Sequence, residues 1–229
     1  MKKIFTLLAV AAMAYTASAQ SAEWNVSNWA KATYKAETTL DGFTIYAAET
    51  EVDGATKTYS VVIDGSSKTV NGTKYTNRLK TGGAGGVTAE GVLYRILSFD
   101  VPSNGIISLI ATSSNGSEAR VCGVSFGEYL PFATVEGEAN PEGLNTIDIA
   151  AGNPVVYEVK YAGNTATKAF IYSKTGGINF YDFKFTPTEI NAVDEIVVDE
   201  NAPVEYFNLQ GVRVADPSNG LFIRKQGNK

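Results

Sequence analysis

The stretch Asn71-Gly-Thr-Lys-Tyr-Thr-Asn-Arg-Leu-Lys-Thr-Gly-Gly-Ala-Gly-Gly86 contains a turn, a strand and a glycine-rich loop in succession. Asn-Gly favours a hairpin turn because both residues tolerate a positive φ. Side chains alternate between the two faces of a strand, so Arg78 and Lys80 are expected to share one face. Tyr75 and Leu79 are expected on the opposite face. Short turn-and-strand units of this kind predict a β fold.

The same pattern recurs along the chain, with a second strong hairpin signal at Asp41-Gly42. No window shows sustained helical periodicity. Strands spaced about 8–12 residues apart are typical of a sandwich or barrel. The run 106–111 is apolar on both faces, which favours a central position in a sheet. The predicted strands are 33–39, 43–48, 58–63, 74–79, 92–101, 106–111, 118–126, 129–135, 146–149, 155–161, 167–172 and 178–185.

The N-terminus has the features of a secretory signal peptide. Two lysines precede the apolar run 4–15, and Ala17-Ser-Ala19 matches a signal-peptidase site. The apolar run is too short to span a membrane, and no later run is longer. We expect cleavage before Gln20 and a secreted or cell-surface protein. The predicted organisation is a signal peptide (1–19), a sandwich (20–187), a linker (188–201) and a small C-terminal β unit (202–229).

Composition excludes several functions. The mature chain holds 17 basic and 24 acidic residues, a net charge of −7, which argues against a nucleic-acid partner. Histidine is absent, so Ser-His-Asp, Cys-His and the usual zinc sites cannot form. Cys122 is the single cysteine, and we expect it to be a small buried apolar residue. No cofactor is predicted.

Acidic residues alternate at Glu49, Glu51 and Asp53, as in calcium-binding loops. The closing acid of such a loop is missing, since Ser60 occupies its place. A solvated loop is therefore favoured, and no metal ligand is assigned.

The candidate ligand site starts from Arg78 and Lys80, two cations beside a loop in which four glycines leave room for a ligand. The alternative is that both belong to a charged outer face of a sheet. Trp29 is a candidate stacking platform for a sugar ring, or one of two tryptophans that close the end of the sandwich. A lyase using Tyr75, Arg78 and Lys80 also remains open.

Several pieces between Trp24 and Phe185 resemble, in order, the β-sandwich module attached to pectate lyases and other secreted polysaccharide-active proteins of Bacteroidota. The run Gly176-Gly-Ile-Asn179 is also similar to the last strand of carbohydrate-binding jelly rolls of the galactose-binding-like type. The resemblance implies that Asn179 meets sugar. The pieces are Asp41-Gly-Phe-Thr-Ile, Val62-Ile-Asp-Gly, Tyr75-Thr-Asn-Arg-Leu-Lys-Thr-Gly-Gly83, Leu109-Ile-Ala-Thr-Ser-Ser-Asn and Gly176-Gly-Ile-Asn-Phe-Tyr-Asp-Phe-Lys-Phe185.

The C-terminal run from Glu205 to Lys229 contains Tyr-Phe-Asn-Leu-Gln-Gly and, later, Gly-Leu-Phe-Ile. It resembles the sorting domains of type IX secretion. Such tails usually continue after Gly-Asn-Lys into a last apolar strand, which this sequence lacks.

The leading hypothesis is an all-β, jelly-roll or galactose-binding-like sandwich that binds a polysaccharide or oligosaccharide without catalysis. Its ligand-binding residues are Arg78, Lys80 and Asn179, with Tyr75 and Trp29 as stacking candidates. Arginine and lysine suit an acidic plant polysaccharide, because a guanidinium grips a carboxylate through two hydrogen bonds. A lyase-like enzyme and a structural or adhesive surface protein are the alternatives. The oligomeric state is left open.

Overall fold

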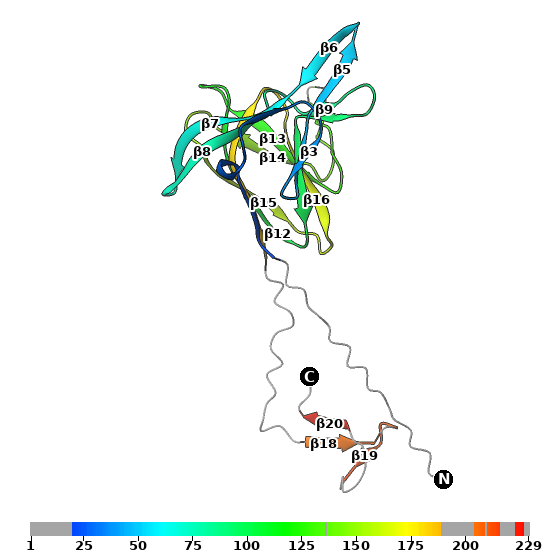
Figure 1. Ribbon diagram of the computed structural model, residues 1–229. Coiled ribbons are helices and arrows are strands. Elements are labelled where there is room, and N and C mark those ends of the chain that lie inside the picture. Colours follow the sequence, from blue (N-terminus) through cyan, green and yellow to red (C-terminus); the bar gives the residue numbers. More distant parts are fainter. Residues whose placement is uncertain (1–19, 136, 189–203, 209, 216–222, 227–229) are drawn as a thin grey trace, which may run out of the picture. The chain divides into compact units, whose positions relative to one another are not determined.

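The computed structural model describes residues 20–135, 137–188, 204–208, 210–215 and 223–226. The predicted signal peptide and residues 189–201 of the predicted linker lie outside this range. The chain divides into two units, one ending at Thr188 and the other starting at Glu189 (Figure 1). In the described residues, no helix is long and apolar enough to cross a membrane.

The first unit is a sandwich of two antiparallel sheets, which confirms the all-β prediction (Figure 1). After β12, the chain passes repeatedly between the sheets, as in a jelly roll. The seven-stranded sheet contains β1 (Ala22–Asn25), β2 (Ala32–Tyr34), β7 (Val61–Val70), β8 (Thr73–Lys80), β12 (Gly105–Ser113), β15 (Val155–Tyr161) and β17 (Ile178–Pro187). The six-stranded sheet contains β3 (Thr38–Leu40), β4 (Phe43–Tyr46), β11 (Ile96–Val101), β13 (Arg120–Phe126), β14 (Asn145–Ile149) and β16 (Thr167–Ser173).

Three smaller elements lie outside the two sheets. The hairpin of β5 (Ala48–Val52) and β6 (Ala55–Tyr59) extends away from the sandwich (Figure 1). Strands β9 (Gly86–Val87) and β10 (Leu93–Tyr94) pair with each other. A short 3₁₀ helix, η1 (Val26–Asn28), follows β1.

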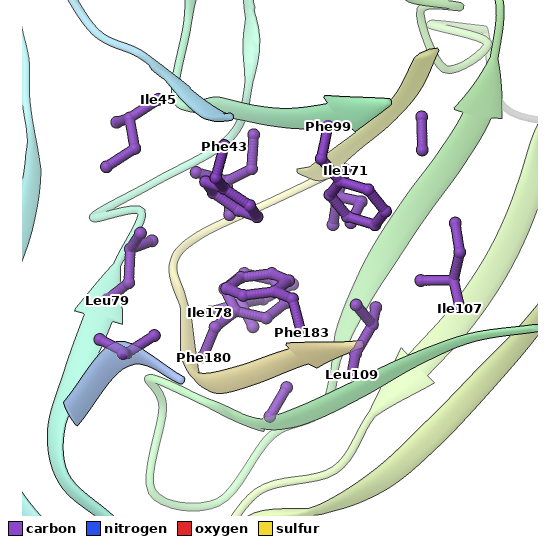
Figure 2. Close-up of a cluster of buried hydrophobic side chains, with 14 of the residues drawn as sticks. Phe43, Ile45, Leu79, Phe99, Ile107, Leu109, Ile171, Ile178, Phe180 and Phe183 are labelled. Atoms are coloured by element: carbon purple, nitrogen blue, oxygen red, sulfur yellow. The ribbon is translucent and has the colours of Figure 1, made fainter. Parts of the chain in front are cut away.

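The core between the sheets is largely aromatic and aliphatic (Figure 2). Phe43 of β4 meets Phe183 of β17 at a ring distance of 4.6 Å, which joins the two sheets. Strand β12 lies between β15 and β17, so the prediction that its apolar run is central is confirmed. Cys122 is fully buried in this core, as expected, and burial raises the pKa of its thiol to about 12.

A β-bulge in β17 places the side chains of Tyr181 and Asp182 next to each other on the outer face of the sheet. Ile110 pairs with Asp182 and Ala111 pairs with Phe180, which leaves Tyr181 without a partner on β12. The extra residue shifts the alternation, so that Phe180 and Phe183 both reach the core. Tyr181 instead packs on the outer face, against Ile110.

The β7–β8 hairpin leaves the sheet and lies across its outer face. Strand β8 pairs with β17 only at two positions, and β1 takes that edge of β17 farther along. A register shift between Gly65 and Lys68 marks where the hairpin departs. Beyond it, Tyr75 packs with Tyr181, and Lys68 Nζ lies 3.3 Å from Asn153 Oδ1. The prediction that Tyr75 shares a face with Leu79 is therefore wrong, because simple alternation ends where the hairpin bends.

Further strand predictions need correction. The run 33–39 divides into β2 and β3, which belong to different sheets, and the run 58–63 divides at Ser60 between β6 and β7. The run 92–101 breaks at Arg95, whose φ of 52° separates β10 from β11. The run 129–135 forms no strand, since Pro131 has no N–H for a ladder. Tyr129 and Phe132 instead cover Tyr172 on the outside of the six-stranded sheet, and the Tyr172 hydroxyl donates to the Leu130 carbonyl.

The described part of the second unit is a three-stranded antiparallel sheet. It contains β18 (Val204–Phe207), β19 (Arg213–Val214) and β20 (Ile223–Gln226). The Asn208 side chain accepts hydrogen bonds from the backbone N–H groups of Gln210 and Val212 and so shapes the turn between β18 and β19.

Candidate functional site

The structure brings Arg78, Lys80 and Asn179 together on the outer face of the seven-stranded sheet. Asn179 is the second residue of β17 and the direct partner of Lys80 on β8. Arg78 lies two residues along the same face. Asp64 of β7 lies opposite Arg78 and completes the group. We call these four residues the β8–β17 face.

Asp64 binds both cations of the β8–β17 face. Its Oδ1 lies 2.8 Å from Arg78 Nε, and its Oδ2 lies 3.1 Å from Lys80 Nζ. Partial burial alone would raise the pKa of Asp64, but the hydrogen bonds from the two cations outweigh it and hold the pKa below its ordinary value. One carboxylate thus neutralises half of the positive charge, and this face keeps one net positive charge.

Two buried polar oxygens lie on the same side of the sheet. Asn179 and Asp182 are each 5% exposed, and Asn179 Oδ1 and Asp182 Oδ2 have no hydrogen-bond partner. Burial and the nearby Glu23 charge, partly opposed by Lys184, raise the pKa of Asp182 to about 7. Little of Asn179 is therefore open to a ligand in this conformation.

The room that the glycine loop was expected to offer a ligand is filled by the protein itself. The Arg95 guanidinium occupies the space where a side chain on Gly83 would lie. A Cβ on Gly85 would lie 2.7 Å from Tyr172 Cβ. The loop is also tied to the start of β17, because Thr81 N donates to the Ile178 carbonyl and Ile178 N donates to Thr81 Oγ1. These glycines permit close internal packing.

A cavity of about 290 Å³ opens beside the two tryptophans. The Asp41-Gly42 turn at its rim has φ values of 50° and 79°, as the Asp-Gly signal predicts for a hairpin. Trp24 Nε1 donates to the Asp41 carbonyl at 2.9 Å, which fixes that turn against β1. The main lining residues are Glu23, Trp24, Asn25, Asn28, Trp29 and Asp41, and we call this cavity the tryptophan pocket.

The two stacking candidates occupy different surroundings. Tyr75 is 5% exposed, and its ring meets that of Tyr181 edge-on at 6.3 Å. Trp29 is 7% exposed and packs on Phe43 at a ring distance of 5.2 Å, while another part of it lines the tryptophan pocket. The structure thus places Trp29 mainly in the core and partly in a cavity wall, and its role as a stacking platform stays a prediction.

Sequence reasoning missed Asp64 and Trp24 as site residues. Strand alternation puts Asp64 on the face opposite Ile63, but its pairing with Arg78 depends on the register between β7 and β8. The closeness of the two tryptophans in the sequence was the available signal for a shared pocket.

Glu49, Glu51 and Asp53, which alternate as in calcium-binding loops, lie in the β5–β6 hairpin. Glu49 Oε1 accepts from Thr58 Oγ1 and also pairs with Lys35 Nζ at 3.1 Å. Glu51 Oε1 accepts from Thr56 Oγ1 at 2.6 Å. Asp53 has a φ of 53° and forms the hairpin turn with Gly54. Across the residues that the structure describes, no group of three acidic or sulfur ligands is placed to hold a metal ion.

Comparison with known proteins identifies no family. No family model matches the chain, and no curated protein matches it. Solved structures do show likenesses, among them carbohydrate-binding modules and a glycosidase.

The likenesses to solved structures are distant. The CBM22-1–GH10 part of endo-1,4-β-D-xylanase 10B from Clostridium thermocellum, complexed with xylohexaose, is 16% identical over 72% of this chain, with a TM-score of 0.32. This chain spans 27% of that one. The C-terminal CBM6 of LamC from Zobellia galactanivorans is 11% identical, with 73% and 99% of the two chains covered and a TM-score of 0.29. An exo-β-1,3-galactanase from Phanerochaete chrysosporium is 9% identical, with 73% and 30% covered and a TM-score of 0.29. TM-scores this low carry no argument about function.

Proposed function

We propose that this protein is an exported, non-catalytic carbohydrate-binding protein. The observation that carries the proposal is the tryptophan pocket. Both tryptophans line it, together with two asparagines and two acidic residues. Sugar rings combine apolar C–H faces with hydroxyl groups, so aromatic walls with a few polar groups suit them.

The size and charge of the tryptophan pocket support a small, uncharged ligand. A cavity of about 290 Å³ is at the small end of ligand pockets and suits a single sugar ring or chain end. Glu23 and Asp41 are its charged lining residues, and both are acidic. An uncharged sugar is therefore the ligand proposed for this pocket, since its hydroxyl groups can donate to the carboxylates.

A glycan array on residues 20–229, followed by calorimetry with the best ligand, tests the proposal. Asn28→Ala and Asp41→Asn change the pocket rim without removing core volume, and the Asp41 carbonyl still accepts from Trp24. Each is expected to weaken binding about fivefold to tenfold, the effect of about one lost hydrogen bond. Asp100→Asn is the matched control, because Asp100 pairs with Lys168 on the six-stranded sheet. Absence of any glycan ligand would favour the structural or adhesive alternative.

An acidic polysaccharide is the finer proposal for the β8–β17 face. One net positive charge remains there beside Asn179, and the Arg78 and Lys80 side chains are 28% and 37% exposed. Binding through this face should be weak and should fall with added salt, because exposed charges are screened. Arg78→Ala should cost about 1–3 kcal/mol of binding to an oligogalacturonate. An unchanged affinity in this variant would remove the β8–β17 face from the proposal.

The lyase alternative is less well supported at this face. A catalytic tyrosine must reach its substrate, whereas Tyr75 is buried against Tyr181 and burial raises the pKa of its hydroxyl. An absorbance assay for unsaturated uronates on pectate tests the alternative directly. Release of such products by the protein would overturn the non-catalytic assignment.

Export is proposed from the N-terminal sequence, and N-terminal sequencing of the secreted protein should begin at Gln20. The resemblance of the C-terminal unit to sorting domains supports a proposal that it directs the chain to the surface. Deleting residues 202–229 should then change the location of the protein without changing its glycan binding.

A further inference from the structure

Arg95 has a backbone conformation that is unusual for its residue type. Four non-glycine residues in the described parts of the chain have a positive φ. Three of them, Asp41, Asp53 and Asn71, precede glycines in hairpin turns, where aspartate and asparagine are common. Arg95 is the fourth, with a φ of 52° between β10 and β11. A left-handed arginine costs about 1 kcal/mol or more and persists only where its surroundings hold it.

The surroundings hold the guanidinium by packing. It lies against the glycine loop, where any side chain on Gly83 would overlap Nη1. Its Cζ also lies over the Tyr59 ring, 5.5 Å from the ring centre. Tyr59 is in turn stacked on Tyr94 at 3.8 Å. An arginine positioned through its flat faces can keep its terminal N–H groups free to bind a ligand.

None of the carboxylates that the structure describes neutralises Arg95. Of the four arginines whose side chains the structure describes, Arg78, Arg120 and Arg213 each have a carboxylate within 4.0 Å, and Arg95 has none. Arg95 Nε is also buried without a hydrogen-bond partner. A second cation is near, because Lys57 Nζ lies 5.0 Å from the centre of the same Tyr59 ring.

We propose that Arg95 is the recognition site for a carboxylate group carried by a sugar acid. The guanidinium fork matches the two oxygens of a carboxylate, and Lys57 adds a favourable field. The Tyr59–Tyr94 pair gives the site an aromatic border. The site is distinct from the tryptophan pocket and from the β8–β17 face. On the β8–β17 face, Asp64 already forms salt bridges with Arg78 and Lys80. This inference depends on the proposed carbohydrate binding in one respect: that proposal is the reason why the carboxylate is taken to belong to a sugar acid.

The first test needs no substitution. The Nε–H resonance of Arg95 is followed by NMR during titration of residues 20–229 with an oligogalacturonate and with an uncharged galactose oligomer of equal length. A saturable shift is expected with the acid alone. No shift with the acid, or equal shifts with both, would overturn the inference. A sulfated oligomer that binds more tightly than the oligogalacturonate would overturn the choice of a carboxylate.

The second test uses variants of Arg95. Asparagine tolerates a positive φ, so Arg95→Asn removes the guanidinium with little backbone strain. Arg95→Lys keeps the charge but loses the fork. Both should weaken oligogalacturonate binding about tenfold or more, as expected for hydrogen bonds to a charged group. Lys168→Asn, which removes a cation already paired with Asp100, should change affinity less than about twofold.

The two proposals can fail separately. Binding of a neutral sugar that responds to Asn28→Ala, with no effect of oligogalacturonate on Arg95, would leave the proposed function standing and refute this inference. Oligogalacturonate binding that Arg78→Ala abolishes and Arg95→Asn leaves intact would place the acid at the β8–β17 face instead, and would also refute it.

Discussion

Asp64 and Asp182 are carboxylates on the outer side of the same sheet, and their surroundings push their pKa values in opposite directions. Two cations hold the pKa of Asp64 below its ordinary value despite its burial. Burial and the Glu23 charge raise the pKa of Asp182 to about 7. The difference comes from pairing, because Asp64 receives charged hydrogen bonds and Asp182 Oδ2 has no partner.

The stability of the sandwich should depend on the protonation of Asp182. The folded protein holds this proton up to about pH 7, whereas an unfolded aspartate releases it near pH ~3.9. The stabilisation is therefore complete below about pH 4 and is lost as pH rises through 7. Asp182→Asn cannot become charged and should be more stable than the parent at pH 8 by about 1–3 kcal/mol, because a buried charge without a partner costs at least as much as a buried neutral group. Urea unfolding at pH 5 and pH 8 measures this, and an equal effect at both pH values would contradict it.

Asp64→Asn should raise the affinity of the β8–β17 face for anionic glycans. The substitution keeps the size of the side chain and removes the charge that Arg78 and Lys80 now share. An anionic ligand then meets two unpaired cations, and about a threefold to tenfold gain in affinity is expected. The gain should disappear at high salt. A loss of affinity would mean that Asp64 itself contacts the ligand.

At the scale of the element, the pairing of β12 with β17 depends on close contact at Gly105. A Cβ there would lie 2.5 Å from the Phe185 ring and 2.5 Å from the Thr186 carbonyl oxygen. Gly105→Ala should therefore destabilise the sandwich by about 1–3 kcal/mol, as overpacking does. Gly116→Ala is the matched control, because nothing lies within 4 Å of its added Cβ. Thermal unfolding measures the melting temperatures of both variants, and similar values for Gly105→Ala and Gly116→Ala would contradict the prediction.

Most strands could be predicted because their determinants are local. Alternating apolar residues and turns rich in glycine, asparagine and proline set the limits of β4, β14 and β15 to within about two residues. The exceptions depend on contacts far along the chain. Arg95 breaks a continuous apolar pattern because its side chain packs on the glycine loop and Tyr59. The bulge at Tyr181 reverses the alternation of inward and outward side chains in β17, and no glycine or proline marks this position in the sequence.

The candidate site was predictable only in part for the same reason. The resemblance of the last strand pointed to Asn179, and β8 alternation pointed to Arg78 and Lys80, and the structure brings these three together. Asp64 is 14 residues away from Arg78, and their pairing follows from hairpin register. Arg95 stands in the sequence as an interruption of an apolar run, and nothing local shows which element its side chain meets.

At the scale of the whole molecule, the sandwich should fold without the C-terminal unit. The chain divides between Thr188 and Glu189, and the core residues of the sandwich all precede this point. A chain of residues 20–188 should melt within about 3 °C of residues 20–229, a difference of roughly 1 kcal/mol. Calorimetry on the two chains measures this. An insoluble or much less stable shorter chain would show that the C-terminal unit supports the sandwich.

Strand β17 is the last strand of the sandwich in sequence and yet lies in the middle of its sheet. Before its residues leave the ribosome, the seven-stranded sheet can exist only as two pieces, β15–β12 and β8–β7–β2, with β1 unattached. Phe180, Phe183 and Phe185 are also missing from the core until then. Folding of the sandwich must therefore follow the synthesis of almost its whole length, since these long-range pairings cannot form earlier. Until that moment the core of the sandwich is incomplete, a delay that would favour the export proposed from the N-terminal sequence.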